Sequence, residues 1–163
     1  MRNDWDKATI KYVIDADTLM LQKGKEKPFK VRLIAIDAFE TKFNHRVFGQ
    51  LKILKNVHQN NPRHKDKYSH TVKKVIALGL QAKNFVSKRY LGKEVKFYSY
   101  GKDQYGRELV WVQGLTYSLV RHGFAVYYPN NQIHKLRKEH LLELSRDSNQ
   151  NHRGIYKRFQ NGL

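Results

Sequence analysis

The stretch "VIDADTLMLQ", residues 13–22, places two aspartates, Asp15 and Asp17, between apolar residues that are typical of β-strands. A second stretch, "VRLIAIDAFETK" at residues 31–42, closes a strongly apolar run with Asp37 and Glu40. The chain has 14 Asp and Glu against 32 Lys and Arg, so four of its few acids fall in two short segments. Such clustering indicates a metal site, a general base, or hydrogen bonding within a turn.

The apolar pattern around these acids predicts a barrel. The predicted strands cover residues 8–14, 18–23, 29–36, 95–98 and 108–112. Apolar residues at helical spacing predict helices at 72–90, 115–122 and 133–144. Three strands, a helix, two strands and two helices indicate a small closed barrel with helices around it, which is an α+β fold that is mainly β.

Composition limits the class of partner. At 163 residues the chain suits a single domain, 1–163, and its net charge of +18 favours a polyanion, with nucleic acid ahead of an anionic membrane surface. A soluble protein with a positive surface is the alternative. The absence of cysteine excludes disulfides, and no apolar run approaches the roughly 18 residues of a membrane span. The first residues, "MRNDWDKATI", lack the apolar segment of a signal peptide.

Residues 43–74, which we call the basic segment, fit the barrel plan least well. They hold eight Lys and Arg, the single acid Asp66 and four of the eight histidines, His45, His58, His64 and His70. A structureless loop of about thirty residues is unusual in a compact domain, and "VFGQLKILKNV" is able to form a short helix. We interpret the segment as a partly mobile basic insertion that grips a polyanion. Solvated histidines are favoured over a zinc site, because the spacing matches no usual ligand pattern.

The clustered acids predict a site for hard cations. If the barrel brings Asp17 and Asp37 together at its open end, their oxygens suit Ca²⁺ or Mg²⁺. The alternative is that Asp15 and Asp17 only make hydrogen bonds within the hairpin turn. Arg32 lies in the otherwise apolar run "VRLIAI", and a buried guanidinium is rare without an anionic partner. That partner is either a bound phosphate or one of these same acids.

Two further charged residues complete a set for phosphodiester hydrolysis. Glu40 follows the end of a predicted strand, where a general base faces solvent, and Arg107 begins another strand in "DQYGREL". A metal and guanidinium groups stabilise charge on phosphoryl oxygens, while a carboxylate activates water. The set as a whole therefore predicts a nuclease.

"VIDADT", "VRLIAIDAFETK" and "DQYGREL" resemble, in this order, the signature stretches of the staphylococcal-nuclease-like (thermonuclease) family. "LVRHGFAVYYPNN", a final helix and "GIY" at 154–156 resemble its C-terminal third, so the resemblance spans about residues 8–156 apart from the basic segment. It implies an OB-fold five-stranded barrel with three helices, Ca²⁺ dependence, and hydrolysis of DNA and RNA to 3′-phosphate products. It also implies a secreted or cell-envelope protein, whose leader would precede this sequence.

The resemblance also implies roles for single residues. The implied metal ligands are Asp17, Asp37 and the backbone carbonyl of Ala38. Asp15 is implied to interact with these ligands without binding the metal itself. The implied catalytic residues are Arg32, Glu40 and Arg107. In this scheme the two arginines hold the scissile phosphate and the glutamate acts as the general base.

The sequence departs from the family pattern in places. Ala16 stands where glycine is usual, and we expect it to tighten the turn and lower metal affinity. The segment after residue 123 is shorter, which leaves open whether Tyr105, Tyr127 or Tyr128 contacts substrate. Stacked tyrosines beside a basic groove suit single-stranded or frayed nucleic acid. Barrel packing is the alternative for Tyr127 and Tyr128.

The sequence thus predicts a calcium-dependent, sugar-nonspecific nuclease that acts as a monomer. The alternative is a catalytically inactive nucleic-acid-binding module on the same OB barrel. An inactive module would not need all five charged site residues, and all five are present, which favours the enzyme. An anionic-membrane-binding protein would need a basic amphipathic helix with an exposed apolar face, and none is evident.

Overall fold

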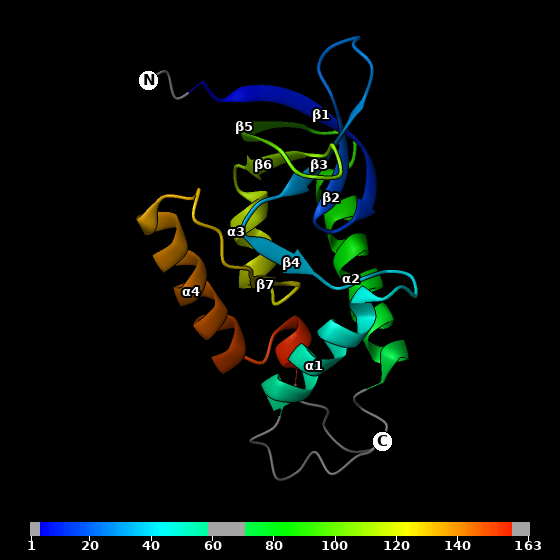
Figure 1. Ribbon diagram of the computed structural model, residues 1–163, viewed down its shortest axis with the longest axis vertical. Coiled ribbons are helices and arrows are strands. Elements are labelled where there is room, and N and C mark those ends of the chain that lie inside the picture. Colours follow the sequence, from blue (N-terminus) through cyan, green and yellow to red (C-terminus); the bar gives the residue numbers. More distant parts are fainter. Residues whose placement is uncertain (1–3, 59–70, 158–163) are drawn as a thin grey trace.

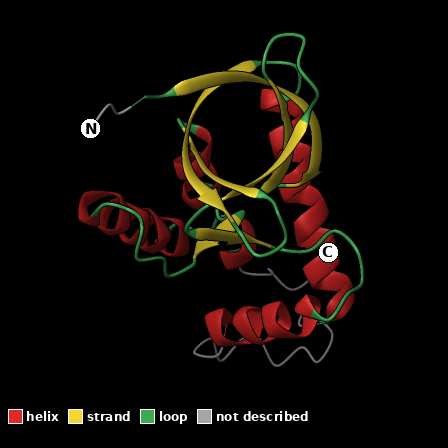
Figure 2. Ribbon diagram, turned by 45° about the horizontal axis from the view of Figure 1, so that its top comes forward, coloured by secondary structure: helices red, strands yellow, loops and turns green. Residues whose placement is uncertain are grey.

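The computed structural model describes residues 4–58 and 71–157 (Figure 1). Its barrel strands are β1 (Asp6–Asp15), β2 (Thr18–Gln22), β3 (Phe29–Leu33), β5 (Glu94–Lys102) and β6 (Glu108–Val112). They close in the order β1-β2-β3-β6-β5, and Figure 2 looks into the resulting ring. All neighbours are antiparallel except β3 and β6, which run parallel with Val31 opposite Glu108. The predicted five-stranded barrel is confirmed.

The barrel forms because apolar and polar residues alternate along its strands, so that one face of each strand can be buried. In β2, Leu19 and Leu21 point inward and are fully buried, and the hairpin with β1 places Asp15 opposite Thr18. Antiparallel pairing of β2 with β3 then places Thr18 opposite Arg32. Since side chains in a strand alternate between the two faces, this register determines which polar groups meet at the strand ends.

The predicted strand at 29–36 is broken in two, which corrects the prediction. Ala35 has a φ of 64°, in the left-handed region that an extended strand cannot include. The chain therefore leaves the barrel after Leu33 and forms a separate short strand, β4 (Ile36–Ala38). This strand pairs antiparallel with β7 (Ala125–Tyr127), so the turn predicted at "YYPNN" begins only after a strand that includes Tyr127.

The three predicted helices are present, and the described residues contain a fourth α-helix. Those predicted are α2 (Val72–Tyr90), α3 (Leu115–Arg121) and α4 (Lys135–Gln150). The additional helix is α1 (Arg46–His58), in the first half of the basic segment, where a short helix had been considered possible. Residues 59–70 of that segment lie outside the described residues. Whether the segment is an insertion stays a prediction.

Two groups of buried apolar residues hold the elements together. The larger one fills the barrel and extends under α3 and α4, with Ile10, Phe97 and Leu119 almost fully buried. The smaller one, which we call the second core, lies between α1, α2 and the short 3₁₀-helix η1 (Gly154–Tyr156). The buried members of the second core are Phe39, Val47, Leu54, Val75, Leu78, Ile155 and Tyr156. The predicted "GIY" anchor is therefore part of it.

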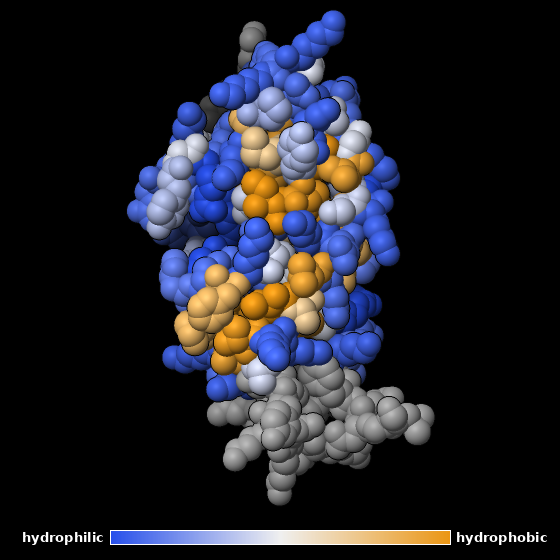
Figure 3. All heavy atoms as spheres, turned by 90° about the vertical axis from the view of Figure 1, so that its right-hand side faces the viewer, coloured by the Kyte–Doolittle hydropathy of each residue, from blue (hydrophilic) through white to orange (hydrophobic). Residues whose placement is uncertain are grey.

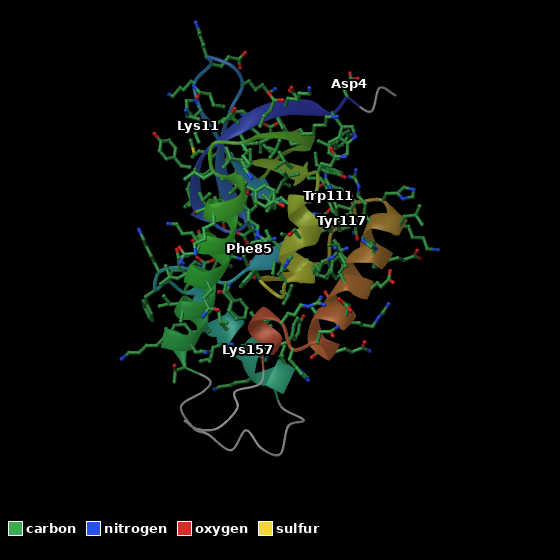
Figure 4. The ribbon with its side chains drawn as sticks, turned by 180° about the vertical axis from the view of Figure 1, so that it is seen from behind. Asp4, Lys11, Phe85, Trp111, Tyr117 and Lys157 are labelled. Atoms are coloured by element: carbon green, nitrogen blue, oxygen red, sulfur yellow. The ribbon has the colours of Figure 1, made fainter. Side chains whose placement is uncertain are left out.

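Helix α4 packs on the molecule through aromatic side chains. Trp111 of β6 and Tyr117 of α3 meet edge to face with centroids 4.9 Å apart, and they lie side by side in Figure 4. The ring of Tyr117 in turn meets that of His140 of α4, with 4.5 Å between the ring centroids. Leu141 and Leu144 of the same helix are buried. The predicted core role of the last helix is thus confirmed for Ile133, Leu141 and Leu144, whereas Leu136 is exposed. Within the described residues, no helix has both the length and the apolarity needed to cross a membrane.

One glycine sets how closely a helix approaches the loop after β4. A Cβ at Gly79 of α2 would lie only 2.2 Å from the carbonyl oxygen of Glu40. Real atoms do not approach so closely, so any larger residue would push the two backbones apart. Gly79 therefore lets α2 touch the segment that carries Glu40 directly.

Candidate active site

The ends of three strands and the loop after β4 bring the predicted acids and one arginine together. Asp17 follows β1 in the hairpin turn, Arg32 lies in β3 next to it, and Asp37 is the central residue of β4. Glu40 lies two residues beyond the end of β4. Asp17, Arg32 and Asp37 are all buried, although such side chains are normally exposed.

Arg32 links the two aspartates. Its Nη1 lies 2.5 Å from Asp17 Oδ2 and its Nη2 lies 3.0 Å from Asp37 Oδ1, while the residue is only 8% exposed. The guanidinium also donates to the backbone carbonyl of Asp17 at 3.5 Å. Of the two partners predicted for this buried arginine, the structure shows the acids themselves.

Asp17 does more than complete a turn. Its Oδ2 accepts a hydrogen bond of 2.6 Å from the backbone N–H of Ala38, and its Oδ1 accepts one of 3.2 Å from the Thr18 hydroxyl. Burial raises the pKa of Asp17 above its ordinary value, the positive charge of Arg32 opposes this shift, and the negative charge of Asp37 adds to it. The carboxylate therefore ties the hairpin to β4.

Asp15 and Ala16 form the rest of the turn. Asp15 Oδ1 accepts a 2.6 Å hydrogen bond from the Thr41 hydroxyl, which joins the end of β1 to the loop after β4. Ala16 is fully buried. Among the described residues other than glycine, a positive φ occurs at Ala35 and His152, so alanine fits this turn without backbone strain. Its expected effect on metal affinity stays a prediction.

Helix α1 adds two residues that the sequence analysis did not assign to the site. Arg46 Nη2 lies 2.6 Å from Asp37 Oδ1, and its Nη1 lies 3.2 Å from Glu40 Oε1. Gln50, one turn further along, is buried; its Nε2 donates to the carbonyl of Ala38 at 3.0 Å and its Oε1 accepts from the Glu40 N–H at 2.8 Å. The i, i+4 spacing of two polar residues beside the apolar Val47 and Leu54 was the available signal.

Glu40 is oriented by these neighbours. Its Oε1 is paired with Arg46, and its Oε2 accepts a 2.7 Å hydrogen bond from the Asn44 side chain. The side chain is 13% exposed, so it faces solvent only in part. Burial lowers the pKa of Arg46, but the charges of Asp37 and Glu40 outweigh this and raise it, so the guanidinium stays charged.

Arg107 is not joined to this cluster in the structure. Its Nε lies 2.8 Å from Asp103 Oδ2, and the guanidinium lies over the ring of Tyr105 at 5.5 Å. Burial acts to raise the pKa of Asp103, but hydrogen bonds from Arg107 and Tyr105 lower it below the ordinary value. Arg107 does lie just before β6, the parallel neighbour of β3.

The three predicted tyrosines differ in exposure. Tyr105 and Tyr128 are exposed, so both rings are free to contact a ligand. Tyr127 is partly buried and packs against the barrel core, which is the alternative considered for it. Tyr128 is placed by its backbone N–H, which donates to the carbonyl of Ala35 at 2.9 Å, close to the start of β4.

The donors present fit a hard divalent cation. Among the described residues, no group of three or more His, Cys, Asp or Glu side chains is arranged to hold a metal by itself. Asp17 and Asp37 nevertheless offer carboxylate oxygens, and the Ala38 carbonyl retains a lone pair after accepting from Gln50. Three carboxylates, Asp17, Asp37 and Glu40, face two guanidinium groups, which leaves one negative charge. Oxygen donors and negative charge are what Ca²⁺ requires.

Comparison with known proteins identifies a family for most of the chain. A family model described as staphylococcal nuclease homologue matches residues 30–158. The match covers β3 to η1 and includes Arg32, Asp37, Glu40 and Arg107. A search of curated proteins finds no match for the chain.

Proposed function

Since the chain belongs to the family of staphylococcal nuclease homologues, we propose that it is a calcium-dependent nuclease that hydrolyses phosphodiester bonds of DNA and RNA to 3′-phosphate products. Family membership supports a nuclease-like protein that binds nucleic acid, and the net charge of +18 agrees with such a partner. The observation that carries the proposal is Arg32, a buried guanidinium held by both Asp17 and Asp37 beside Glu40.

The proposed reaction starts with the acids. Asp17, Asp37 and the Ala38 carbonyl would hold Ca²⁺, which would supply positive charge to the phosphoryl oxygens and orient a water molecule. Glu40, fixed by Asn44 and Arg46, would take the proton from the attacking water. Its orientation by two neighbours matters because proton transfer requires hydrogen-bond distance.

The arginines provide the second element of the proposal. Arg32 would donate to the oxygens of the scissile phosphate, where a planar guanidinium stabilises the negative charge that develops in the transition state. Arg107 would add a second guanidinium from the start of β6, and to do so it must leave Asp103. Exposed Tyr105 and Tyr128 would contact bases or phosphates of a single-stranded or frayed substrate.

The alternative is an inactive nucleic-acid-binding module on the same barrel. Such a module has no use for three clustered carboxylates, two of them buried, with their counter-charges, because burying charged groups costs free energy even when they are paired. The oriented Glu40 also favours an enzyme, since a base is not needed for binding.

The proposal is tested by cleavage of plasmid DNA, single-stranded DNA and RNA with Ca²⁺, with Mg²⁺ or with a chelator, followed by analysis of the new ends. We expect cleavage with Ca²⁺, less with Mg²⁺ because it demands stricter octahedral geometry, and none with chelator. The new ends should carry 3′-phosphate and 5′-hydroxyl groups. Undiminished cleavage in excess chelator would show that the calcium proposal is wrong, and tight binding without any cleavage would support the inactive module.

A further inference from the structure

Two phenylalanines at the rim of the site are exposed to solvent. Phe43 is 67% exposed and Phe48 is 57% exposed, and their rings meet edge to face with centroids 5.9 Å apart. Phenylalanine is normally buried, because its transfer from water is strongly favourable. Two adjacent exposed rings therefore indicate a contact with something outside the chain.

Helix α1 presents a different chemistry on each of its faces. Val47 and Leu54 point into the second core, and Arg46 and Gln50 point at the carboxylates. The remaining face carries the exposed residues Phe48, Lys52 and Lys55, which follow the helical spacing i, i+4, i+7. Among the described residues, neither Phe43 nor Phe48 belongs to a core group.

The position of the rings relates them to the site. Phe43 lies three residues after Glu40, and its neighbour Asn44 donates to the Glu40 carboxylate. Phe48 lies two residues after Arg46, which bridges Asp37 and Glu40. On the helix, residues i and i+2 point to different sides, so Phe48 lies on another face of α1 than Arg46. A strand held at the acids and Arg32 would therefore have to continue over the start of α1 to reach the two rings.

From these observations we infer that Phe43 and Phe48 form a stacking subsite for nucleobases of a single strand, next to the scissile phosphate. Lys52 and Lys55 contact the backbone phosphates of the same strand. This inference rests on the proposed function, because it assumes that nucleic acid occupies the site. Stacking of a base on an aromatic ring is worth about 1–3 kcal/mol and tolerates any base, which suits a nonspecific enzyme.

The surroundings of the two rings favour a nucleic-acid strand over a protein partner or a membrane. Figure 3 shows two apolar patches on the face that carries α2, one in its upper half and one in its lower half, with hydrophilic side chains around and between them. A protein interface would have a broad apolar core with few charges. A membrane-binding helix would expose a continuous apolar face. The exposed face of α1 instead carries one aromatic ring, that of Phe48, followed by two lysines, Lys52 and Lys55.

The test measures binding apart from cleavage. Fluorescence anisotropy in chelator gives the Kd of the whole protein for a labelled oligothymidylate and for an abasic strand of equal length. We compare the wild type with the Phe43→Ala/Phe48→Ala variant and with Phe48→Trp. Leu136→Ala on α4 is the control, because Leu136 is also 67% exposed. Thermal unfolding checks that each variant is folded.

We expect the double variant to bind oligothymidylate about tenfold or more weakly, which corresponds to at least one lost stack. Its Kd for the abasic strand should change less than twofold, Phe48→Trp should bind as the wild type does, and Leu136→Ala should change neither Kd. Equal losses on both strands, or no loss, would overturn the inference. A wild-type dimer that the double variant converts to monomer would show instead that the rings form a self-interface.

The same measurements distinguish failure of the proposed function from failure of the stacking subsite. If the wild type binds no oligonucleotide in chelator and cleaves none with Ca²⁺, the proposed function and the stacking subsite both fail. If the wild type binds and cleaves but the double variant does so equally well, only the stacking subsite fails.

Discussion

The barrel with β4 and the helical layer of α1 with the second core contribute different residues to the site. The barrel supplies Arg32 from β3 and Asp17 from the turn between β1 and β2, and the separate strand β4 supplies Asp37. The helical layer supplies Arg46 and Gln50 from one face of one helix. The side chain of Arg32 is 10% exposed, whereas that of Arg46 is 38% exposed.

This difference shows how a cluster of buried acids is tolerated in one domain. The rigid strands hold the carboxylates at fixed positions, and the helix brings part of the counter-charge from the solvent side. Screening by water makes the interactions of the exposed guanidinium weaker than those of the buried one. The barrel should therefore determine whether the site exists, and the helix should adjust how it works.

The largest effect is expected at Glu40, where the two regions meet. Glu40→Gln keeps the shape of the side chain but cannot accept a proton, so the rate of cleavage should fall by about 10²–10⁴-fold. The Kd for nucleic acid, measured in chelator, should stay within about twofold because binding does not need the base. Cleavage at the wild-type rate would place the base elsewhere.

Removing each arginine in turn tests the comparison directly. Arg32→Ala leaves the buried Asp17 without its charged partner and Asp37 with Arg46 alone, and should lower the free energy of unfolding by about 3–5 kcal/mol. Arg46→Ala removes a partly exposed group and should lower it by only about 1 kcal/mol. Denaturant unfolding in metal-free buffer measures both.

Arg153→Ala is the matched control for Arg46→Ala. Arg153 has the same side-chain exposure of 38% and the same 2.6 Å contact with an aspartate, Asp147, but lies away from the site. The partner of Arg153 is more exposed, 46% against 7% for Asp37, so Arg153→Ala should cost no more stability than Arg46→Ala, while only Arg46→Ala should slow cleavage. Equal losses of stability for Arg32→Ala and Arg46→Ala would contradict the division between barrel and helix.

The contact between α2 and the loop after β4 gives an intermediate effect. Gly79→Ala places a Cβ 2.2 Å from the carbonyl oxygen of Glu40, so it should lower the free energy of unfolding by about 1–3 kcal/mol and also slow cleavage. Gly49→Ala on α1, where nothing lies within 4 Å of the added Cβ, should instead stabilise the protein by about 0.5–1 kcal/mol. Thermal unfolding and a cleavage assay distinguish the two, and a tolerated Gly79→Ala would show that α2 can move.

The smallest effect concerns pH. The raised pKa of Asp17 means that its contribution to stability is present below the unfolded value of 3.8 and is lost as the pH rises through its folded pKa. Asp103 has the opposite sign, because its lowered pKa gives stability above 3.8 that is lost on acidification. In metal-free unfolding titrations from about pH 3 to 7, Asp17→Asn should remove a fall in stability with rising pH, and Asp103→Asn should remove a rise. Slopes of the same sign for both variants would contradict these shifts.

The barrel half of the site could be predicted from the sequence because its signals are local. Alternating apolar residues, an aspartate turn and an arginine in an apolar run indicated where Asp17, Arg32 and Asp37 lie. The break of β3 at Ala35 could not be predicted, because a positive φ at alanine leaves no mark in the sequence. The positive φ directs the chain out of β3, and β4 then pairs with β7.

The helical half was harder to predict for a physical reason. In "RVFGQLKILKNV" three faces serve three purposes, so Arg46 and Gln50 could not be told from solvated polar residues by periodicity alone. The pairing of Arg107 with Asp103 is likewise a turn contact that competes with the role implied by resemblance.

The parallel pairing of β3 with β6 has a consequence for how the chain folds. Val31 and Glu108 are neighbours although 108 − 31 = 77 residues separate them. Bringing such distant segments together costs chain entropy before any contact forms, so we expect this pairing to form late in folding. During synthesis β6 emerges after the first three barrel strands, so we expect one edge of β3 to stay unpaired until then.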